Sequence, residues 1–146
     1  MCLAVTDWKN SCKTGLKMTD SEQRYRLVVL GAGRVGKSSI IRRLLKDEFV
    51  EGYKATVEDL HCRDYEADGN TIKVDILDTA GDLEFPAMRR LSISSAHAFL
   101  LVYSIDDRAS FDEVRRLREQ IKEERAGYGE LPCVVAGNKV SYLGAD

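Results

Sequence analysis

The sequence has no long apolar run and little excess charge, and its four cysteines include no C-x-x-C pair. The missing pair argues against a zinc site or a disulfide framework and suits a reducing compartment. No run is long enough to span a membrane, and the first residues lack the apolar core of a signal peptide. A formal net charge of −2 provides no basic field for nucleic acid or anionic lipid. These absences predict a cytoplasmic protein that has no nucleic-acid partner.

The composition is otherwise that of an ordinary globular protein. Hydrophobic residues make up 44% and charged residues 32% of the 146 residues, and a chain of this length favours one domain. Residues 1–23 are polar and show no sustained period, so we expect them to form a flexible N-terminal extension. Residues 24–146 contain the alternating strand-like and helix-like segments of the folded domain.

A glycine-rich segment carries most of the functional information. Residues 31–38, Gly-Ala-Gly-Arg-Val-Gly-Lys-Ser, fit the phosphate-loop pattern G-x-x-x-x-G-K-[ST] between a predicted strand at 24–30 and a predicted helix at 37–46. Glycines let backbone N–H groups surround a phosphate, and the helix N-terminus favours an anion. Lys37 would reach the β- and γ-phosphates, and the Ser38 hydroxyl would bind Mg²⁺. The pattern predicts nucleoside triphosphate binding; the alternative is a glycine turn with a solvated lysine.

The remaining segments predict a doubly wound α/β fold with a mostly parallel sheet. We expect strands at 57–67, 71–77, 98–104 and 132–136, a short helix ending near 95 and a helix at 110–126. The Asp-Gly pair within residues 68–70 predicts a hairpin turn. The apolar runs 98–103 and 132–136 predict strands that are buried on both faces. Ser110 and Glu113 fit a capping box at the start of the last helix. One face of that helix carries Phe111, Val114, Leu117 and Ile121.

Four signatures occur in order between residues 24 and 139. After the phosphate loop come Phe49, then Tyr53-Lys-Ala-Thr-Val-Glu-Asp59, then Asp78-Thr-Ala-Gly81, then Asn138-Lys139. Lys37 precedes Thr56 by 19 residues and Asp78 by 41. With these motifs and spacings the sequence resembles a Ras-superfamily small GTPase. Segments 85–94, Phe-Pro-Ala-Met-Arg-Arg-Leu-Ser-Ile-Ser, and 97–104, His-Ala-Phe-Leu-Leu-Val-Tyr-Ser, most resemble the Di-Ras and Rhes/Dexras branch of the Ras family.

The resemblance implies a site for GTP or GDP with Mg²⁺. Its nucleotide-binding residues would be Gly31, Ala32, Gly33, Arg34, Val35, Gly36, Lys37, Ser38, Ser39, Phe49, Thr56, Asp78, Thr79, Ala80, Gly81, Asn138 and Lys139. Its Mg²⁺ ligands would be Ser38, Thr56 and, through a water, Asp78. Its catalytic residues would be Lys37, Gly81 and Asp82. Its effector surface would comprise Tyr53, Lys54, Ala55, Thr56, Val57, Glu58, Asp59, Leu60 and His61.

One departure from the family pattern concerns hydrolysis. Asp82 stands where Ras-like enzymes usually carry the glutamine that orients the attacking water. An ionised aspartate only accepts hydrogen bonds, and it adds negative charge beside the transition state. We therefore expect slow intrinsic hydrolysis; the alternative is that Asp82 faces solvent and another residue or a partner positions the water. Arg34, which is unusual within the phosphate loop, is expected to point to solvent.

A second departure concerns the end of the sequence. Ser141 stands where the family carries an aspartate that pairs with guanine, which predicts a weaker preference for guanine. The family's last strand and closing helix are missing, so we expect a C-terminally truncated G domain with an exposed sheet edge. We therefore expect no lipid anchor in this chain, whereas a full-length relative would be prenylated and associated with the plasma membrane. His61 and His97 are too isolated in the sequence to suggest a metal site or a catalytic base.

Three functional readings follow from the sequence. The leading one is a monomeric GTP-binding switch that engages effector, exchange-factor and GTPase-activating proteins. A second is a nucleotide-binding-defective G domain that acts only as an interaction module. A third is a P-loop ATP-dependent phosphotransferase, which would not need Thr56 or the Asn138-Lys139 pair at these spacings. The relative affinities for GTP, GDP and ATP distinguish the three.

Overall fold

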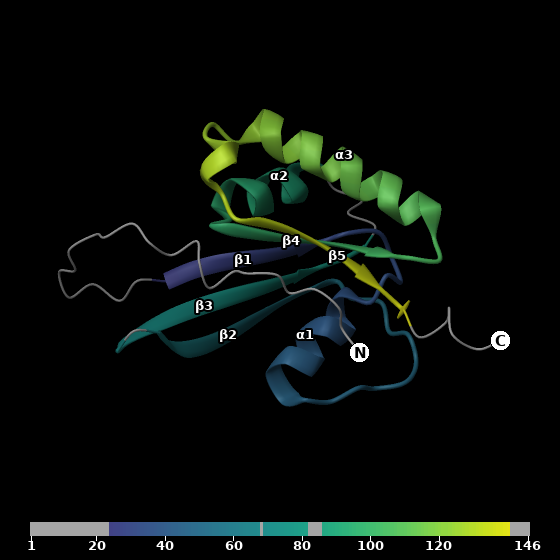
Figure 1. The fold of residues 1–146 in the computed structure, drawn as a ribbon, viewed down its shortest axis with the longest axis horizontal. Helices are drawn as coiled ribbons and strands as arrows, with labels where there is room; N and C mark the ends of the chain where they lie inside the picture. The colour runs from purple at the N-terminus through teal and green to yellow at the C-terminus, as the bar shows by residue number, and fades with distance from the viewer. Residues whose placement is uncertain (1–23, 68, 82–85, 141–146) are drawn as a thin grey trace.

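The computed structural model describes residues 24–67, 69–81 and 86–140, which form a five-stranded sheet with helices on both faces (Figure 1). The strands are β1 (Arg24–Leu30), β2 (Glu58–Ala67), β3 (Asn70–Thr79), β4 (Ala98–Ser104) and β5 (Cys133–Asn138). The helices are α1 (Lys37–Lys46), α2 (Pro86–Ser95), α3 (Arg108–Glu124) and a short 3-10 helix, η2 (Tyr128–Glu130). The strand order is β2-β3-β1-β4-β5, and only the β2–β3 pair is antiparallel. The predicted α/β class with a mostly parallel sheet is confirmed.

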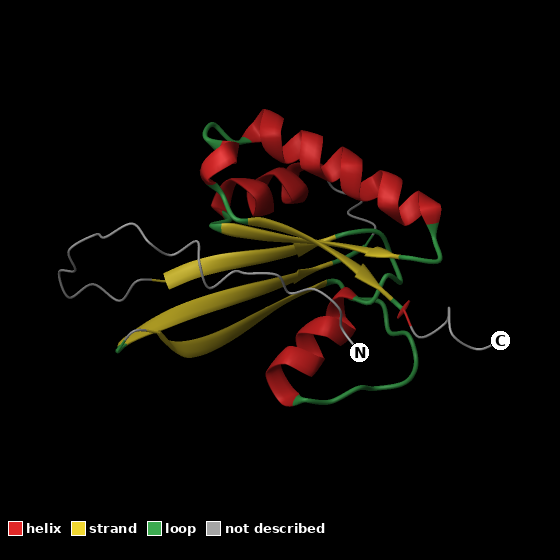
Figure 2. Ribbon diagram, in the orientation of Figure 1, coloured by secondary structure: helices red, strands yellow, loops and turns green. Residues whose placement is uncertain are grey.

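The sheet lies between helices on both of its faces, and each face has its own core cluster (Figure 2). On one face of the sheet, α2 and α3 cover a core cluster that includes Val28, Phe99 and Ile121. On the other face, α1 covers a second cluster that includes Val29 and Ile41. Because successive residues of a strand point to opposite faces, neighbouring residues of β1 belong to different clusters. The central strand is therefore held from both sides. Among the described helices, none is both long and apolar enough to cross a membrane.

The end of β3 extends further than the sequence predicts. The strand continues two residues past the predicted end at 77, because Asp78 pairs with Val29 of β1 and with Asp59 of β2. The Thr79 hydroxyl also donates a hydrogen bond to the Val29 carbonyl at 2.6 Å. Asp78 consequently lies on a strand that is hydrogen-bonded on both sides, which fixes its backbone position.

The start of α3 also differs from the prediction. Its N-cap is Asp107, whose carboxylate accepts hydrogen bonds from the N–H groups of Ala109 and Ser110. Ser110 lies inside the helix and is 1% exposed, and its hydroxyl accepts a hydrogen bond from the Ser104 N–H. The capping box predicted at Ser110 is therefore wrong, because that hydroxyl is engaged with β4. The predicted apolar face is confirmed by the burial of Val114, Leu117 and Ile121.

Among the described strands, β5 lies at an edge of the sheet, which agrees with the expected exposed edge and contradicts the burial on both faces predicted from its apolar run. Within the described residues it pairs with β4 alone. Val134 and Val135 are 44% and 45% exposed. The burial prediction fails here because an apolar run does not reveal whether a second strand and a covering layer lie beside it. The result is an apolar strip at an exposed sheet edge.

Candidate nucleotide-binding site

The phosphate-loop segment connects the carboxyl end of β1 to the start of α1. Gly36 precedes the helix in left-handed backbone with a φ of 98°, and a Cβ at this position would lie 2.2 Å from Asn138 Nδ2. Asn138 donates from the same Nδ2 atom to the Val35 carbonyl at 2.9 Å. No side chain caps this helix start within the described structure, so its first N–H groups are available to an anion. The loop therefore lies at the carboxyl end of the sheet, where α/β folds bind ligands.

Lys37 lies against the phosphate loop. It is 6% exposed, and its Nζ donates hydrogen bonds of 2.9 Å to the carbonyls of Gly31 and Ala32. An ammonium group held in this way places a positive charge at the loop, in addition to the positive end of the helix dipole. Lys37 is therefore not solvated, in contrast to one part of the glycine-turn alternative, and phosphate binding by the loop stays a prediction.

Two hydroxyls predicted to bind Mg²⁺ meet beside Lys37. Ser38 Oγ, at the start of α1, lies 2.7 Å from Thr56 Oγ1, in the segment that precedes β2. Adjacent ligands of an octahedral Mg²⁺ ion with bonds of 2.0–2.1 Å lie about 2.9 Å apart. The two hydroxyls thus have nearly the spacing that the ion requires.

Asp78 brings a carboxylate to the same place from the end of β3. It is 2% exposed, and its Oδ1 has no hydrogen-bond partner among the described residues. Burial raises the pKa of Asp78, whereas a hydrogen bond from Ser38 and the charge of Lys37 lower it. A buried carboxylate oxygen without a partner is costly unless a cation or a water satisfies it. Two hydroxyls and a carboxylate are oxygen ligands of the kind that Mg²⁺ prefers, so these residues fit the ion.

The segment after β3 touches the phosphate loop. A Cβ at Gly81 would lie 2.2 Å from the Cα of Gly33, so the two backbones are in direct contact. This contact places the Gly81 N–H close to the loop, and its predicted approach to the γ-phosphate stays a prediction. Asp82, the predicted water-orienting position, lies outside the described residues.

Comparison with known proteins gives the same result as the motifs. Residues 26–143 match the family described as Ras family. The chain belongs to the Ras family. It is 49% identical over 126 residues to the GTP-binding protein Rhes of Homo sapiens, with 82% of this chain and 47% of Rhes covered. It is 44% identical over 122 residues to the GTP-binding protein Di-Ras2 of Mus musculus, with 84% of this chain and 61% of Di-Ras2 covered.

A third relative of this Ras-family chain is the GTP-binding protein Di-Ras1 of Homo sapiens. The two are 38% identical over 122 residues, which cover 84% of this chain and 62% of Di-Ras1. The predicted Rhes and Di-Ras branch is confirmed by these relatives. The chain spans about half the length of Rhes and about three fifths of Di-Ras2 and Di-Ras1.

The predicted guanine side of the Ras-family site lies at the end of β5. Asn138 is anchored there to the phosphate loop, and Lys139 follows it in left-handed backbone with a φ of 69°. Phe49 is 68% exposed in the segment between α1 and β2, and its position against a guanine stays a prediction. Ser141 lies outside the described residues.

The predicted effector segment, residues 53–61, begins before β2 and continues into it. Three of its apolar or aromatic side chains are strongly exposed: Tyr53 at 61%, Val57 at 88% and Leu60 at 50%. Exposed apolar side chains are a common property of surfaces that bind other proteins. The segment is therefore accessible, as an effector surface must be.

Arg34 is exposed, as expected, and it also contacts an aromatic ring. Its guanidinium carbon lies 4.8 Å from the ring centroid of Tyr53, within the range of a cation–π interaction. The contact connects the phosphate loop to the effector segment. Sequence reasoning missed it because the two residues lie on separate loops, and no local pattern places one against the other.

His61 is isolated in the sequence, but the fold places it beside two carboxylates. One ligand atom each from Asp59, His61 and Asp78 lie within 4.8 Å of one another. His97 has a structural role, because its Nδ1 accepts a hydrogen bond from the Arg26 N–H at 2.9 Å. The signal that could have found the first group is strand alternation, which puts residues 59 and 61 on one face of β2.

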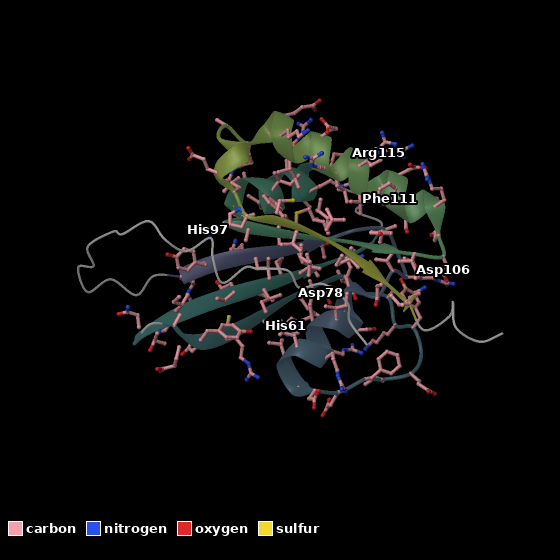
Figure 3. All side chains as sticks on the ribbon, viewed as in Figure 1. His61, Asp78, His97, Asp106, Phe111 and Arg115 are labelled. Carbon is pink, nitrogen blue, oxygen red and sulfur yellow. The ribbon has the colours of Figure 1, made fainter. Side chains whose placement is uncertain are left out.

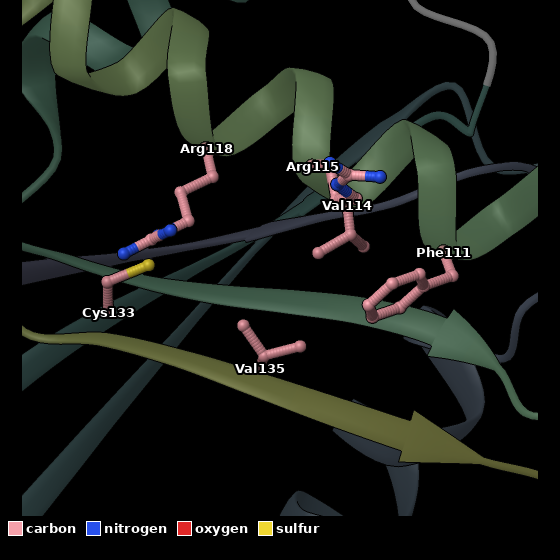
Figure 4. A pocket seen from close by; sticks show the side chains of 6 residues that line it. All are labelled: Phe111, Val114, Arg115, Arg118, Cys133 and Val135. Carbon is pink, nitrogen blue, oxygen red and sulfur yellow. The ribbon is translucent and has the colours of Figure 1, made fainter.

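A separate groove lies between α3 and β5 (Figure 4). Its volume is about 500 Å³, and its lining residues are Phe111, Val114, Arg115, Arg118, Cys133 and Val135. None of the residues predicted from the sequence for nucleotide, Mg²⁺ or effector binding lines this groove. The candidate site is therefore the group of charged and polar residues at the carboxyl end of the sheet, and it is separate from this groove.

Proposed function

We propose that this chain is a Ras-like molecular switch that binds GTP and GDP with Mg²⁺ and hydrolyses GTP slowly. The observation that carries the proposal is the meeting of the Ser38–Thr56 hydroxyl pair with the buried Asp78 carboxylate beside Lys37. These groups come from α1, from the segment before β2 and from β3. Their convergence depends on the whole fold, so it supports the function more strongly than the phosphate-loop motif does alone.

The proposed mechanism rests on positioning and charge, without a covalent intermediate. Loop N–H groups and Lys37 would bind the phosphates, Ser38 and Thr56 would hold Mg²⁺, and Asp78 would hold it through a water. Mg²⁺, when bound, would neutralise charge on the phosphate oxygens. Thr56 would connect the γ-phosphate to the effector segment, because its hydroxyl already lies against Ser38. Loss of the γ-phosphate would then release that segment.

Slow hydrolysis is proposed from the chemistry of Asp82. A carboxylate cannot donate a hydrogen bond to position the attacking water, and its charge opposes the negative charge of the transition state. Single-turnover GTP cleavage by the unaltered chain and by Asp82→Gln tests this point. We expect faster cleavage by the substituted chain, and an equal or slower rate would contradict the proposed role.

Nucleotide titration tests the switch itself. We expect GTP and GDP to bind more tightly than ATP in the presence of Mg²⁺. The preference for guanine over adenine should be smaller than in relatives that carry an aspartate at this position. Ser141 cannot make the charge-assisted hydrogen bond of that aspartate to the base, which is worth about 1.5–3 kcal/mol. The absence of measurable binding would support the interaction module instead. Tighter binding of ATP would support a phosphotransferase.

The proposed switch would act through protein partners. The exposed side chains of Tyr53, Val57 and Leu60 support an effector surface, and exchange-factor and GTPase-activating proteins are expected to regulate it. Gly33 brings no side chain that would obstruct an arginine inserted at the phosphate loop by an activating protein. Free thiols at Cys62 and Cys133 support a reducing compartment such as the cytoplasm, where we place the chain as a monomer.

A further inference from the structure

The β2–β3 hairpin places three potential metal ligands on one face of the sheet. Its register sets Asp59 of β2 directly opposite Asp78 of β3, and His61 opposite Ile76. Residues two apart on a strand share a face, so His61 lies beside the Asp59–Asp78 pair. Ile76 belongs to the cluster that α1 covers, which identifies the face. Figure 3 labels His61 and Asp78 close together on this side of the sheet.

The three side chains form a small group that opens to solvent. One ligand atom from each lies within 4.8 Å of the others. Asp78 is buried and its Oδ1 has no hydrogen-bond partner among the described residues, whereas Asp59 is exposed and His61 is half-buried. Like charges directly opposite each other on paired strands are destabilising. A cation between the two carboxylates would offset this repulsion and satisfy the buried oxygen.

The donor set favours a transition metal over Mg²⁺. An imidazole nitrogen with two carboxylate oxygens is a common ligand set for Zn²⁺, whereas Mg²⁺ prefers oxygen alone. Ligands of a tetrahedral Zn²⁺ ion with bonds of 2.0–2.1 Å lie about 3.3 Å apart. The ligand atoms lie within 4.8 Å of one another, so their separations must shrink by at most about 1.5 Å, a change that side-chain rotamer shifts can supply. Water would complete the coordination.

We propose that Asp59, His61 and Asp78 form a binding site for a transition-metal dication such as Zn²⁺, and that this ion competes with nucleotide-bound Mg²⁺ for Asp78. The competition rests on the proposed nucleotide function, whereas the binding of Zn²⁺ does not. A metal bound here would also join the effector segment to β3. Its occupancy would disfavour both the nucleotide-loaded state and access to residues 59–61.

Metal binding is measured first with Co²⁺ alone and Zn²⁺ alone, on the full chain after EDTA treatment and buffer exchange. Co²⁺ serves as a visible probe, because its absorption reports tetrahedral ligands, and Zn²⁺ should displace it. His61→Gln is compared with His97→Gln, since the sequence has two histidines and both variants make the same chemical change. Asp59→Asn and Cys62→Ser complete the set. Circular dichroism verifies that each variant is folded.

We expect His61→Gln and Asp59→Asn to weaken Zn²⁺ and Co²⁺ binding by at least about tenfold, because even outer-shell groups are worth that much. His97→Gln and Cys62→Ser should leave the affinity unchanged. No binding to the unaltered chain, equal binding by His61→Gln, or a loss of binding in Cys62→Ser would overturn the site. The last result would identify a thiolate as the ligand.

The competition is measured by repeating the Zn²⁺ titration with saturating Mg²⁺-GDP. We expect the apparent Zn²⁺ affinity to fall by at least about tenfold, since linkage makes the two ions oppose each other at the shared carboxylate. An unchanged affinity in a chain that binds GDP would overturn the competition. A chain that binds Zn²⁺ at His61 but no GDP would support the metal site and contradict the proposed function.

Discussion

At the scale of single residues, Asp75 on β3 is a buried carboxylate that contacts two arginines and a cysteine. It is 3% exposed, and its carboxylate lies 3.1 Å from Arg24 and 4.0 Å from Arg26. Cys62 stands directly opposite it on β2. A hydrogen bond from the Cys62 thiol is the main reason that the pKa of Asp75 lies below its usual value, and the two arginines lower it further. The carboxylate in turn raises the pKa of the thiol.

The lowered pKa of Asp75 predicts a pH-dependent contribution to stability. Its folded-state pKa lies below the unfolded value of about 3.9, so the contribution is complete above that pH and is lost as the pH falls further. Asp75→Asn should lower the free energy of unfolding by about 1–3 kcal/mol at pH 7, by loss of charged hydrogen bonds. The difference from the unaltered chain should shrink below about pH 4. Urea unfolding at several pH values measures this difference.

The exposed Asp64 on the same hairpin provides the control for Asp75. Asp64→Asn should change the free energy of unfolding by less than about 0.5 kcal/mol, as surface substitutions usually do. A deficit in Asp75→Asn that stays constant between pH 7 and pH 3 would show that the ionised carboxylate is not the source of the stability.

Arg34 gives a second prediction at this scale. Its contact with Tyr53 connects the phosphate loop to the effector segment, and an exposed cation–π pair is worth about 0.5–1 kcal/mol. If the contact helps to hold that segment over the bound nucleotide, Arg34→Ala should speed GDP release about two- to fivefold. Release of a fluorescent GDP analogue measures the rate. Tyr53→Leu should have the same effect, and the double variant should show no additional acceleration.

At the scale of elements, α3 shows how tertiary contacts select one of two capping patterns. Asp107 and Ser110 both suit an N-cap, and Ser110 has the glutamate three residues later that a capping box requires. The structure uses Asp107 because Ser110 lies against β4, where its hydroxyl accepts from Ser104 and donates to the Asp107 carbonyl at 2.7 Å. A local pattern could not reveal that neighbour.

The cap assignment predicts the cost of substitutions at Asp107. Asp107→Ala should lower the free energy of unfolding by about 1 kcal/mol, because two N–H groups of the first turn lose their acceptor. Asp107→Asn is the matched control, since asparagine also caps helices well, and it should cost little. Urea unfolding of both variants measures the difference. Equal stability of Asp107→Ala and Asp107→Asn would contradict the assignment.

The difference between local sequence patterns and tertiary contacts explains which parts of the fold were predictable. Strands and helices followed from hydrophobic periodicity and from the phosphate-loop and Asp-Gly motifs, which act over a few residues. The register of the β2–β3 hairpin depends on the length of its turn, and a difference of one residue changes every cross-strand pair. A three-residue turn at 68–70 would pair Ala67 with Thr71, whereas the structure pairs it with Asn70. That shift of one residue would place Asp78 opposite Leu60, on the face away from Asp59, and hide the cluster with His61.

The candidate site was predictable to a similar degree. The residues proposed to bind phosphate and Mg²⁺ followed from motifs, because those ligands demand fixed residue types at fixed spacings. The Arg34–Tyr53 and Asp59–His61–Asp78 contacts were not predicted, since each joins side chains from segments that only the folded chain brings together. The burial of β5 was overestimated because the exposure of a strand depends on the strands and helices that lie beside it, which its own sequence does not show.

At the scale of the whole molecule, the candidate site is where separate parts of the chain meet. The phosphate loop contacts Asn138 from the end of β5 and Gly81 from the segment after β3, and Ser38 of α1 contacts Thr56. A ligand that bridges these segments binds the folded chain and has no equivalent site in the unfolded one. Nucleotide binding should therefore stabilise the entire fold and not one loop.

This coupling predicts a rise in the melting temperature with Mg²⁺-GDP. At a ligand concentration about 100 times its Kd, mass action adds about 2.7 kcal/mol to the free energy of unfolding. For a domain of this size the melting temperature should increase by about 5–10 °C. Mg²⁺-ATP should produce a smaller increase. Ser38→Ala, which removes a hydroxyl at the proposed ion site, should reduce the shift with Mg²⁺-GDP more than the shift with GDP and EDTA. Identical melting curves with and without Mg²⁺-GDP would contradict the proposed switch, because tight binding to the folded chain alone cannot leave its stability unchanged.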